Sequence, residues 1–501
     1  MRRLVIIIFL FPALATVAQK KGNPKIYSKL ITTADMKANL HTLAGDEMEG
    51  RETATEGQRK AANLLENKFR SFGLLPGNNG SYQMQYPVYI DTLVNASVTV
   101  NESPFEAGKD FSFSIGASHT ASYDFSQVLF PGFGISDSAR DDYKGVDARG
   151  KLVMVLSPNI SGNISPKARR SFNFYTQQQA AMDHGAAALL VVEPEIAEMP
   201  GKGNMYVNIY HKVMRINTFF VSEKLAAAIV GDEYAAKKAE ALQGETVTKQ
   251  YEANVALAVD KKRLALHSSN VLGLLEGTDL KDEYVILSAH YDHLGRRGNT
   301  IWYGADDDAS GTTSILELAK AFSKAKAEGR GPRRSILFMT VSGEEKGLWG
   351  SDYYGSHPVY PLDKTTVDLN IDMVGRIDPS RKYGDSTNYI YVIGDDKLSS
   401  DLKPISEAIN KKNTKLELDY KYNDPKDPER IYYRSDHYNF AKHGVPVIFY
   451  FSGLHADYHM PTDTPDKINY DLMKKRILLV FYTAWEMANR AGMLKRDIPL
   501  N

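Results

Sequence analysis

The stretch YVILSAHYD (residues 284–292) decides the fold class. Its first six residues form a short apolar run, which is typical of a strand buried on both faces of a sheet. Similar runs recur at residues 271–275, 336–341, 367–371 and 445–451. Amphipathic helical patterns lie between the runs, for example at residues 315–322. This alternation predicts an α/β fold with a central mixed, mainly parallel sheet flanked by helices.

Polar residues follow these apolar runs. In open α/β sheets, ligands bind beyond the carboxyl ends of the strands. The residues expected there are His290, Asp292, the loop GADDDASG (residues 304–311), Glu344, Glu345, Asp372 and His459. Taken singly, each has a structural explanation such as a helix cap or surface charge. Taken together, the carboxylates would repel one another, and a shared divalent cation removes that repulsion.

The number of ligands suggests two metal ions. Two neutral imidazoles and three carboxylates carry three negative charges, and two divalent ions carry four positive charges. One bridging hydroxide brings the sum to zero, which favours a dinuclear site. Mixed imidazole and carboxylate donors suit zinc best. Two metals about 3.5–4 Å apart acidify a bridging water and polarise a substrate carbonyl.

Composition excludes other kinds of chemistry. The chain has 501 residues, with 61 Lys and Arg against 61 Asp and Glu. It therefore has no net charge to attract nucleic acid, which we do not expect as a partner. The absence of cysteine excludes disulfides, cysteine-ligated zinc, iron–sulfur clusters and a thiol nucleophile.

The N-terminus has the pattern of an export signal. Arg2 and Arg3 precede an apolar run at residues 4–14, and small residues precede a predicted cleavage after Ala18. The run is shorter than the about 20 residues of a membrane-spanning helix. We therefore expect an exported protein, periplasmic or secreted, without a membrane span after cleavage. No pattern in the sequence indicates the oligomeric state.

The composition along the chain suggests four segments. We predict a signal peptide at 1–18, an N-terminal part of the main domain at 19–105, an insert at 106–255, and the larger part of the main domain at 256–501. Helical periodicity marks residues 33–75. Short alternating runs broken by Gly, Asp and Pro indicate a β-rich insert with its own core.

Five motifs together resemble the M28 family of zinc metallopeptidases. They are AHYDHLG (289–295), GADDDASG (304–311), Gly343-Glu344-Glu345, NIDM (370–373) and HMPTDT (459–464). The resemblance covers the chain from residue 268 onward, and also residues 43–73 with LAGDEMEGR (43–51). The insert is similar to a protease-associated (PA) domain through YKGVDARGK (143–151) and the strand after it.

The resemblance implies a role for each motif residue. His290 and Asp372 would bind one zinc, Glu345 and His459 the other, and Asp307 both, which makes two Zn²⁺ per chain. Glu344 would act as general base, and its neighbour Glu345 would point the opposite way in an extended segment. Asp292 would orient an imidazole as an outer-shell carboxylate, with Asp463 acting similarly on His459.

Two further residues lie next to these motifs. Tyr458 would donate a hydrogen bond to the oxyanion, although a packing role is an equal alternative. His293 is interpreted as structural. The PA-like insert offers no nucleophile or metal cluster, so its role as a lid or a partner surface is a hypothesis.

The resemblance implies an exported dizinc exopeptidase, an aminopeptidase that hydrolyses the N-terminal peptide bond of peptides through a metal-bridging water. One alternative is a carboxypeptidase or dipeptidase similar to glutamate carboxypeptidase, with Arg376, Arg430 or Arg434 holding the substrate carboxylate. A second is a glutaminyl-cyclase-like transferase, and a third is a non-catalytic, receptor-like binding protein.

Overall fold

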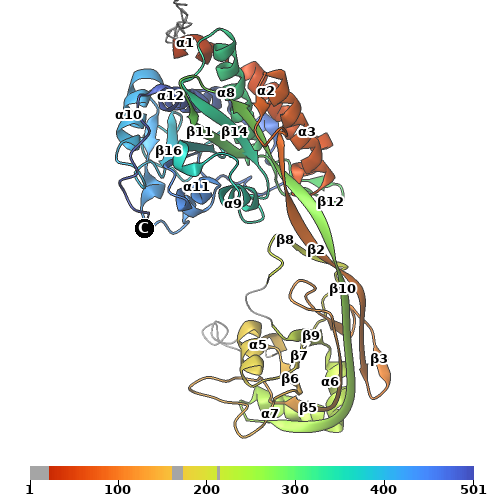
Figure 1. Ribbon diagram of the computed structural model, residues 1–501. Coiled ribbons are helices and arrows are strands. Elements are labelled where there is room, and N and C mark those ends of the chain that lie inside the picture. Colours follow the sequence, from red (N-terminus) through yellow and green to blue (C-terminus); the bar gives the residue numbers. More distant parts are fainter. Residues whose placement is uncertain (1–21, 161–172, 211–214, 501) are drawn as a thin grey trace, which may run out of the picture. The chain divides into compact units, whose positions relative to one another are not determined.

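The computed structural model describes residues 22–160, 173–210 and 215–500, so the predicted signal peptide lies outside the described residues. The chain divides into two compact units (Figure 1), one of Met1–Tyr86 with His267–Asn501 and one of Pro87–Leu266. The long strands β2 (Gln83–Val100) and β10 (Lys249–Leu275) contribute residues to both units. Within the described ranges, no helix has the length and apolar character needed to cross a membrane.

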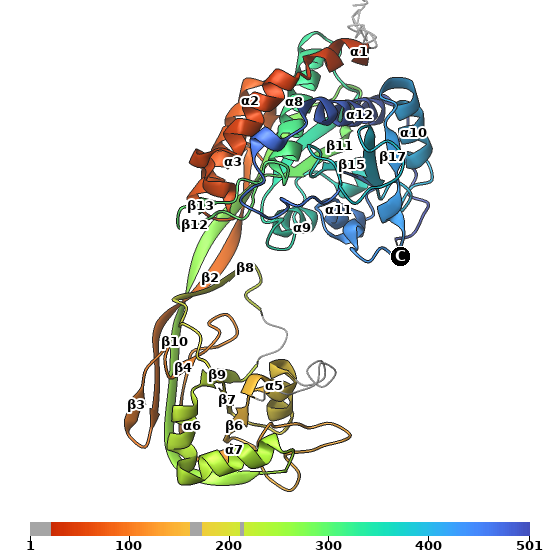
Figure 2. The same cartoon turned by 180° about the vertical axis from the view of Figure 1, so that it is seen from behind.

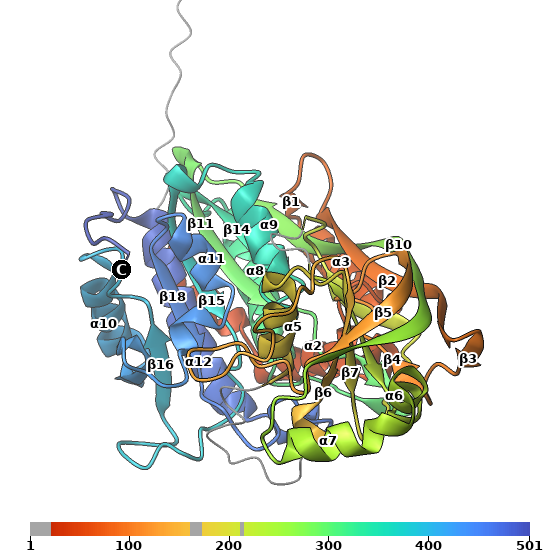
Figure 3. The ribbon, with the colours of Figure 1, turned by 90° about the horizontal axis from the view of Figure 1, so that it is seen from below.

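The first unit is built on a mixed, mainly parallel sheet. Its strands are the end of β10, β11 (Leu280–His290), β14 (Arg334–Val341), β15 (Thr365–Ile371), β16 (Tyr389–Ile393), β17 (Glu417–Asp419) and β18 (Val447–Phe451). They lie in the order β17-β16-β18-β15-β11-β14-β10, and β16, β18, β15, β11 and β14 are labelled in Figure 3. Strands β14, β11, β15 and β18 are parallel, whereas β10 is antiparallel to β14 and β16 to β18. The predicted fold class is confirmed.

Helices cover both faces of this sheet (Figures 1 and 2). One face carries α2 (Thr33–Leu43), α3 (Glu56–Ser71), α8 (Ala309–Ala327), α10 (Leu402–Asn413) and α12 (Tyr470–Asn489), and the other carries α9 (Trp349–Ser356) and α11 (His437–Lys442). Successive residues of β11 point to opposite faces. Val285 and Leu287 therefore join the core under α8 and α12, and Ile286 joins the core under α9 and α11.

The second unit has its own core. Its parallel strands are β5 (Ala121–Phe130), β6 (Leu152–Leu156), β7 (Ala188–Val192) and β9 (Asn217–Val221). Helix α5 (Phe174–Asp183) packs on one face, and α6 (Glu223–Val230) and α7 (Tyr234–Leu242) pack on the other. The segment thus contains helices as well as the strands that its sequence pattern predicted.

A buried arginine ties the N-terminal segment of the first unit to the loops after β11. Arg51 has no exposed surface. Its guanidinium donates hydrogen bonds to the carbonyl oxygens of Leu43 (2.6 Å), Tyr291 (2.7 Å), Tyr303 (2.9 Å) and Gly304 (3.0 Å). Burial lowers its pKa to about 10, so the group stays charged at neutral pH. The side chain therefore holds three chain segments together.

Replacing Arg51 by Met should lower the free energy of unfolding by about 3 kcal/mol, because several buried carbonyls lose their donor. The matched control is Arg59→Met, which removes an exposed arginine paired with Glu56 and should cost less than about 1 kcal/mol. Urea denaturation measures both. Equal losses in the two variants would contradict the role of Arg51.

Candidate metal centre

The predicted ligands lie at the carboxyl edge of the parallel strands. His290 is the last residue of β11, and Asp372 directly follows β15. Glu344 and Glu345 follow β14 in a bend and a turn. The extended segment expected for these two glutamates is wrong, because Gly343 with a φ of +74° turns the chain there. His459 lies in the loop after β18.

Asp307 contacts residues on both sides of the centre. Its Oδ1 lies 3.2 Å from His290 Nε2, and its Oδ2 lies 3.1 Å from His459 Nε2. His290 Nε2 is also 3.7 Å from Asp372 Oδ1. His459 Nε2 is 3.0 Å from Glu345 Oε2. The structure therefore brings together the five residues predicted as ligands, with Asp307 in the middle.

Several polar atoms of this cluster are buried without a hydrogen-bond partner. Within the described part of the chain, these atoms include His290 Nε2, Asp307 Oδ2 and Glu345 Oε1. Their contacts reach ion-pair distance but lack the angles of a hydrogen bond. Unpaired buried polar groups cost about 1–3 kcal/mol each, and charged groups cost more. A divalent cation would satisfy these atoms, and imidazole nitrogens with carboxylate oxygens are donors that suit zinc.

The pKa values of the cluster also indicate that its buried carboxylates require positive charge nearby. Burial alone would raise the pKa of Asp307, yet contacts with His290 and His459 hold it well below its ordinary value. Burial lowers the pKa of His459, but its contacts with Asp307 and Glu345 outweigh this and raise the pKa to about 10. Bound metal ions would replace these protons, because a ligating histidine must be neutral.

The three consecutive aspartates have different tasks. Asp308 Oδ1 accepts a hydrogen bond from the Gly311 amide at 2.7 Å and so caps the N-terminus of α8. Asp306 Oδ1 accepts one from the Gly375 amide at 2.6 Å and so holds the loop after β15. Asp307 alone of the three contacts both His290 and His459.

Two side chains that were not predicted as ligands, Asp308 and His293, lie at this centre. The structure contains two groups of metal-ligand atoms within 4.8 Å of one another, His290 with Asp308 and Asp372, and His293 with Asp307 and Glu345. His293 is fully buried, and its Nδ1 is 2.7 Å from Glu345 Oε1. The sequence signal for His293 is a second imidazole three residues after His290, which by itself favours a structural role.

Asp292 contacts His290 mainly through its backbone. The backbone oxygen of Asp292 lies 3.1 Å from His290 Nδ1, whereas its carboxylate is 3.8 Å away. The carboxylate instead accepts hydrogen bonds from the Thr53 hydroxyl (2.6 Å) and from the Glu344 amide (3.2 Å). Asp292 therefore connects the imidazole of His290 to the turn that carries Glu344.

Asp463 supports the aspartate loop and not His459, for which the sequence predicted it. Its Oδ2 accepts hydrogen bonds from the backbone amides of Asp306 (2.9 Å) and Asp307 (3.2 Å). The prediction was wrong because the loop after β18 places Asp463 next to residues 306–307. The spacing of residues along the sequence does not show the path of that loop.

A small cavity opens at the centre. It is lined by Asp307, Glu344, Asp372, Met373, Ile431, Arg434, Phe449, Phe451, Leu454 and Tyr458. Burial raises the pKa of Glu344 well above its ordinary value, against the opposing charge of His290, and the charges of Glu345 and Asp372 raise it further. The Tyr458 ring stacks on His459 with 3.9 Å between the ring centres.

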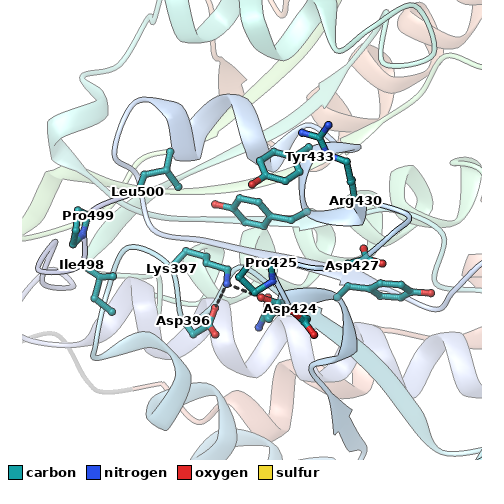
Figure 4. Close-up of a pocket in the computed structure, with 13 residues that line it drawn as sticks. Asp396, Lys397, Asp424, Pro425, Asp427, Arg430, Tyr433, Ile498, Pro499 and Leu500 are labelled. Atoms are coloured by element: carbon teal, nitrogen blue, oxygen red, sulfur yellow. Dashed lines mark hydrogen bonds and ion pairs between the residues drawn. The ribbon is translucent and has the colours of Figure 1, made fainter.

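Only one of the three arginines considered for substrate recognition lines this cavity. Arg434 does so, and its Nη2 donates to the Tyr458 hydroxyl at 3.3 Å. Arg376 is paired with Asp457 at 2.9 Å. Arg430 lines a second cavity of about 480 Å³ beside Tyr433 (Figure 4).

The family of the larger unit follows from its sequence. Residues 270–484 match Peptidase family M28. This part of the chain is similar to the M28 peptidases. A solved aminopeptidase from Aneurinibacillus sp. strain AM-1 has the same fold, with a TM-score of 0.53 and 20% identity over 96% of this chain and 100% of that chain.

Two relatives of this chain carry the name aminopeptidase. Aminopeptidase YwaD of Bacillus subtilis (strain 168) is 26% identical over 231 residues, which are 46% of this chain and 40% of YwaD. Aminopeptidase NAALADL1 of Rattus norvegicus is 36% identical over 110 residues, which are 21% of this chain and 14% of that relative. The matches span less than half the length of each relative.

Zinc should stabilise protein that has been stripped of metal with a chelator. At free zinc about 1,000 times the Kd, one site adds about 4 kcal/mol to the free energy of unfolding. Magnesium should add much less, because imidazole donors do not suit it. Asp307→Asn should lose most of the zinc effect, because Asp307 contacts both sides. Thermal unfolding with each metal measures this, and an unchanged melting temperature with zinc would contradict a metal centre.

Proposed function

We propose that the protein is a zinc aminopeptidase that removes N-terminal residues from peptides. The observation that carries the proposal is the position of Asp307 between His290 and Asp372 on one side and Glu345 and His459 on the other. The M28 match and the relatives named aminopeptidases support it.

In this proposal, the centre holds two zinc ions. His290 and Asp372 would hold one ion, Glu345 and His459 would hold the other, and Asp307 would contact both. When bound, such a pair of ions acidifies a water and polarises the carbonyl of the scissile bond. The remaining tasks fall to the side chains that line the cavity.

Glu344 is the proposed general acid and base. It lines the cavity beside Asp307 and Asp372, and the hydrogen bond from its amide to Asp292 holds its backbone. Its carboxylate would take the proton of the attacking water and return it to the leaving amine. Tyr458 lines the same cavity, and its hydroxyl would donate a hydrogen bond to the oxyanion.

The cavity also bears on which end of a peptide binds. Glu344, the cavity carboxylate that is not a proposed metal ligand, would attract a substrate ammonium group, and apolar side chains such as Phe449 and Phe451 suit an uncharged first residue. A carboxypeptidase needs a cation for the substrate carboxylate, and Arg434 is the arginine at the cavity that offers one. The carboxypeptidase alternative therefore depends on Arg434.

The remaining expectations are also proposals. We propose export, and the pattern of residues 2–18 is its only support. We further propose that the second unit is a PA-type domain, supported by its parallel strands β5, β6, β7 and β9 with helices on both faces.

Replacing Glu344 by Gln should lower kcat about 100- to 10,000-fold, because the side chain can no longer accept a proton. Zinc content should match the wild type, since Glu344 is not a proposed ligand. Glu47→Gln, which changes an exposed glutamate, is the control and should keep full activity. Steady-state kinetics and metal analysis test this, and wild-type kcat in Glu344→Gln would exclude the role.

Digestion of defined peptides should release N-terminal residues, as read by mass spectrometry. N-terminal acetylation should abolish cleavage, because it removes the ammonium group. C-terminal amidation should have little effect, because no substrate carboxylate is recognised. Loss of C-terminal residues, with resistance after amidation, would instead support the carboxypeptidase alternative. Formation of N-terminal pyroglutamate would support the transferase.

A further inference from the structure

We propose that His293 is an additional nitrogen ligand of the zinc held by Glu345 and His459. The inference rests on the proposed function, because it concerns the same metal centre. It assigns to His293 a direct contact with the cation in place of the structural role suggested by the sequence. The Glu345 side of the centre would then have two imidazoles and two carboxylates.

The ring of His293 lies beside Glu345 and Asp307. His293 Nδ1 lies 2.7 Å from Glu345 Oε1 and 3.9 Å from Asp307 Oδ2. All three side chains are buried, and their ligand atoms lie within 4.8 Å of one another. The His293 ring also meets the His459 ring edge to face, with 5.9 Å between their centres. His293 thus faces the same space as the other three donors.

The ring nitrogens of His293 lack hydrogen-bond partners within the described residues. A buried structural histidine normally has its ring nitrogens hydrogen-bonded. Neither His293 nitrogen has such a partner among the described residues, and neither does Glu345 Oε1. His293 Nδ1 and Glu345 Oε1 lie 2.7 Å apart, and a cation bound to both would use the lone pairs of the nitrogen and the oxygen.

Packing fixes the position of the His293 ring. A Cβ atom at Gly304 would lie 2.5 Å from His293 Cγ, so the ring sits directly on the Gly304 backbone. The φ of +55° at Gly304 also favours glycine. The His293 amide donates to the Arg51 carbonyl at 3.3 Å. The ring is therefore held toward Glu345 before any metal binds, as a pre-organised ligand requires.

The proposal makes the two zinc sites unequal. The Glu345 side has imidazoles from His293 and His459, whereas the other side has one from His290. Each nitrogen donor adds affinity for zinc. The first equivalent of zinc should therefore bind on the Glu345 side, and loss of His293 should weaken that one site and leave the other nearly unchanged.

The affinity test uses zinc competition with a chromogenic chelator on the full chain. His293→Asn should weaken one of the two sites by about 100-fold or more, because even supporting residues of metal ligands are worth about 10- to 100-fold. The control is His357→Asn, which changes an exposed histidine on α9's C-terminal side and should bind zinc as the wild type does. Wild-type affinity in His293→Asn would overturn the proposal.

A direct structural test needs no variant, so it holds even if His293→Asn fails to fold. Anomalous diffraction from zinc-loaded wild-type crystals should place a zinc at about 2.0–2.1 Å from a His293 nitrogen. A zinc at the centre but out of bonding distance of His293 overturns this inference alone. A wild-type protein that binds no zinc overturns the proposed function as well.

Discussion

The need to neutralise buried carboxylates dominates this structure. Asp307, Glu345 and Asp372 come from three distant segments and are buried within a few ångströms of one another. Their mutual repulsion in a low-dielectric site is unfavourable unless positive charge lies between them. The carboxylates of Asp307 and Glu345 raise the pKa of His459 to about 10, so without metal the positive charge comes from a protonated imidazole. Divalent cations meet the same need and leave the imidazoles free as ligands.

The fold supplies the geometry that this electrostatic arrangement requires. Parallel strands end at one edge, so β11 and β15 deliver His290 and Asp372 side by side. The aspartate loop needs more support, because it belongs to no strand. Asp463 holds it by two amides, and Arg51 holds the carbonyl of Gly304 at its start.

The sequence predicted the elements whose cause is local. The run at residues 284–289 is apolar because β11 is covered on both faces, and the same reason holds for β14, β15 and β18. Strand β16 went unpredicted, although Tyr389–Ile393 is buried too and its tyrosines and β-branched residues favour a strand. The residues that reach the centre from strand ends followed from the fold. The partner of Asp463 did not, because it depends on the path of a loop.

The contrast between strand ends and loops also explains why the two halves of the centre differ. His290 and Asp372 are held by the sheet itself, through backbone pairing on both sides of each strand. Glu345 and His459 lie in a turn and a loop, where no ladder fixes the backbone. Side chains on such segments keep their geometry only through packing and shared contacts. The fully buried His293, seated on Gly304 and touching Glu345, provides that contact on the side of the centre that the sheet does not reach.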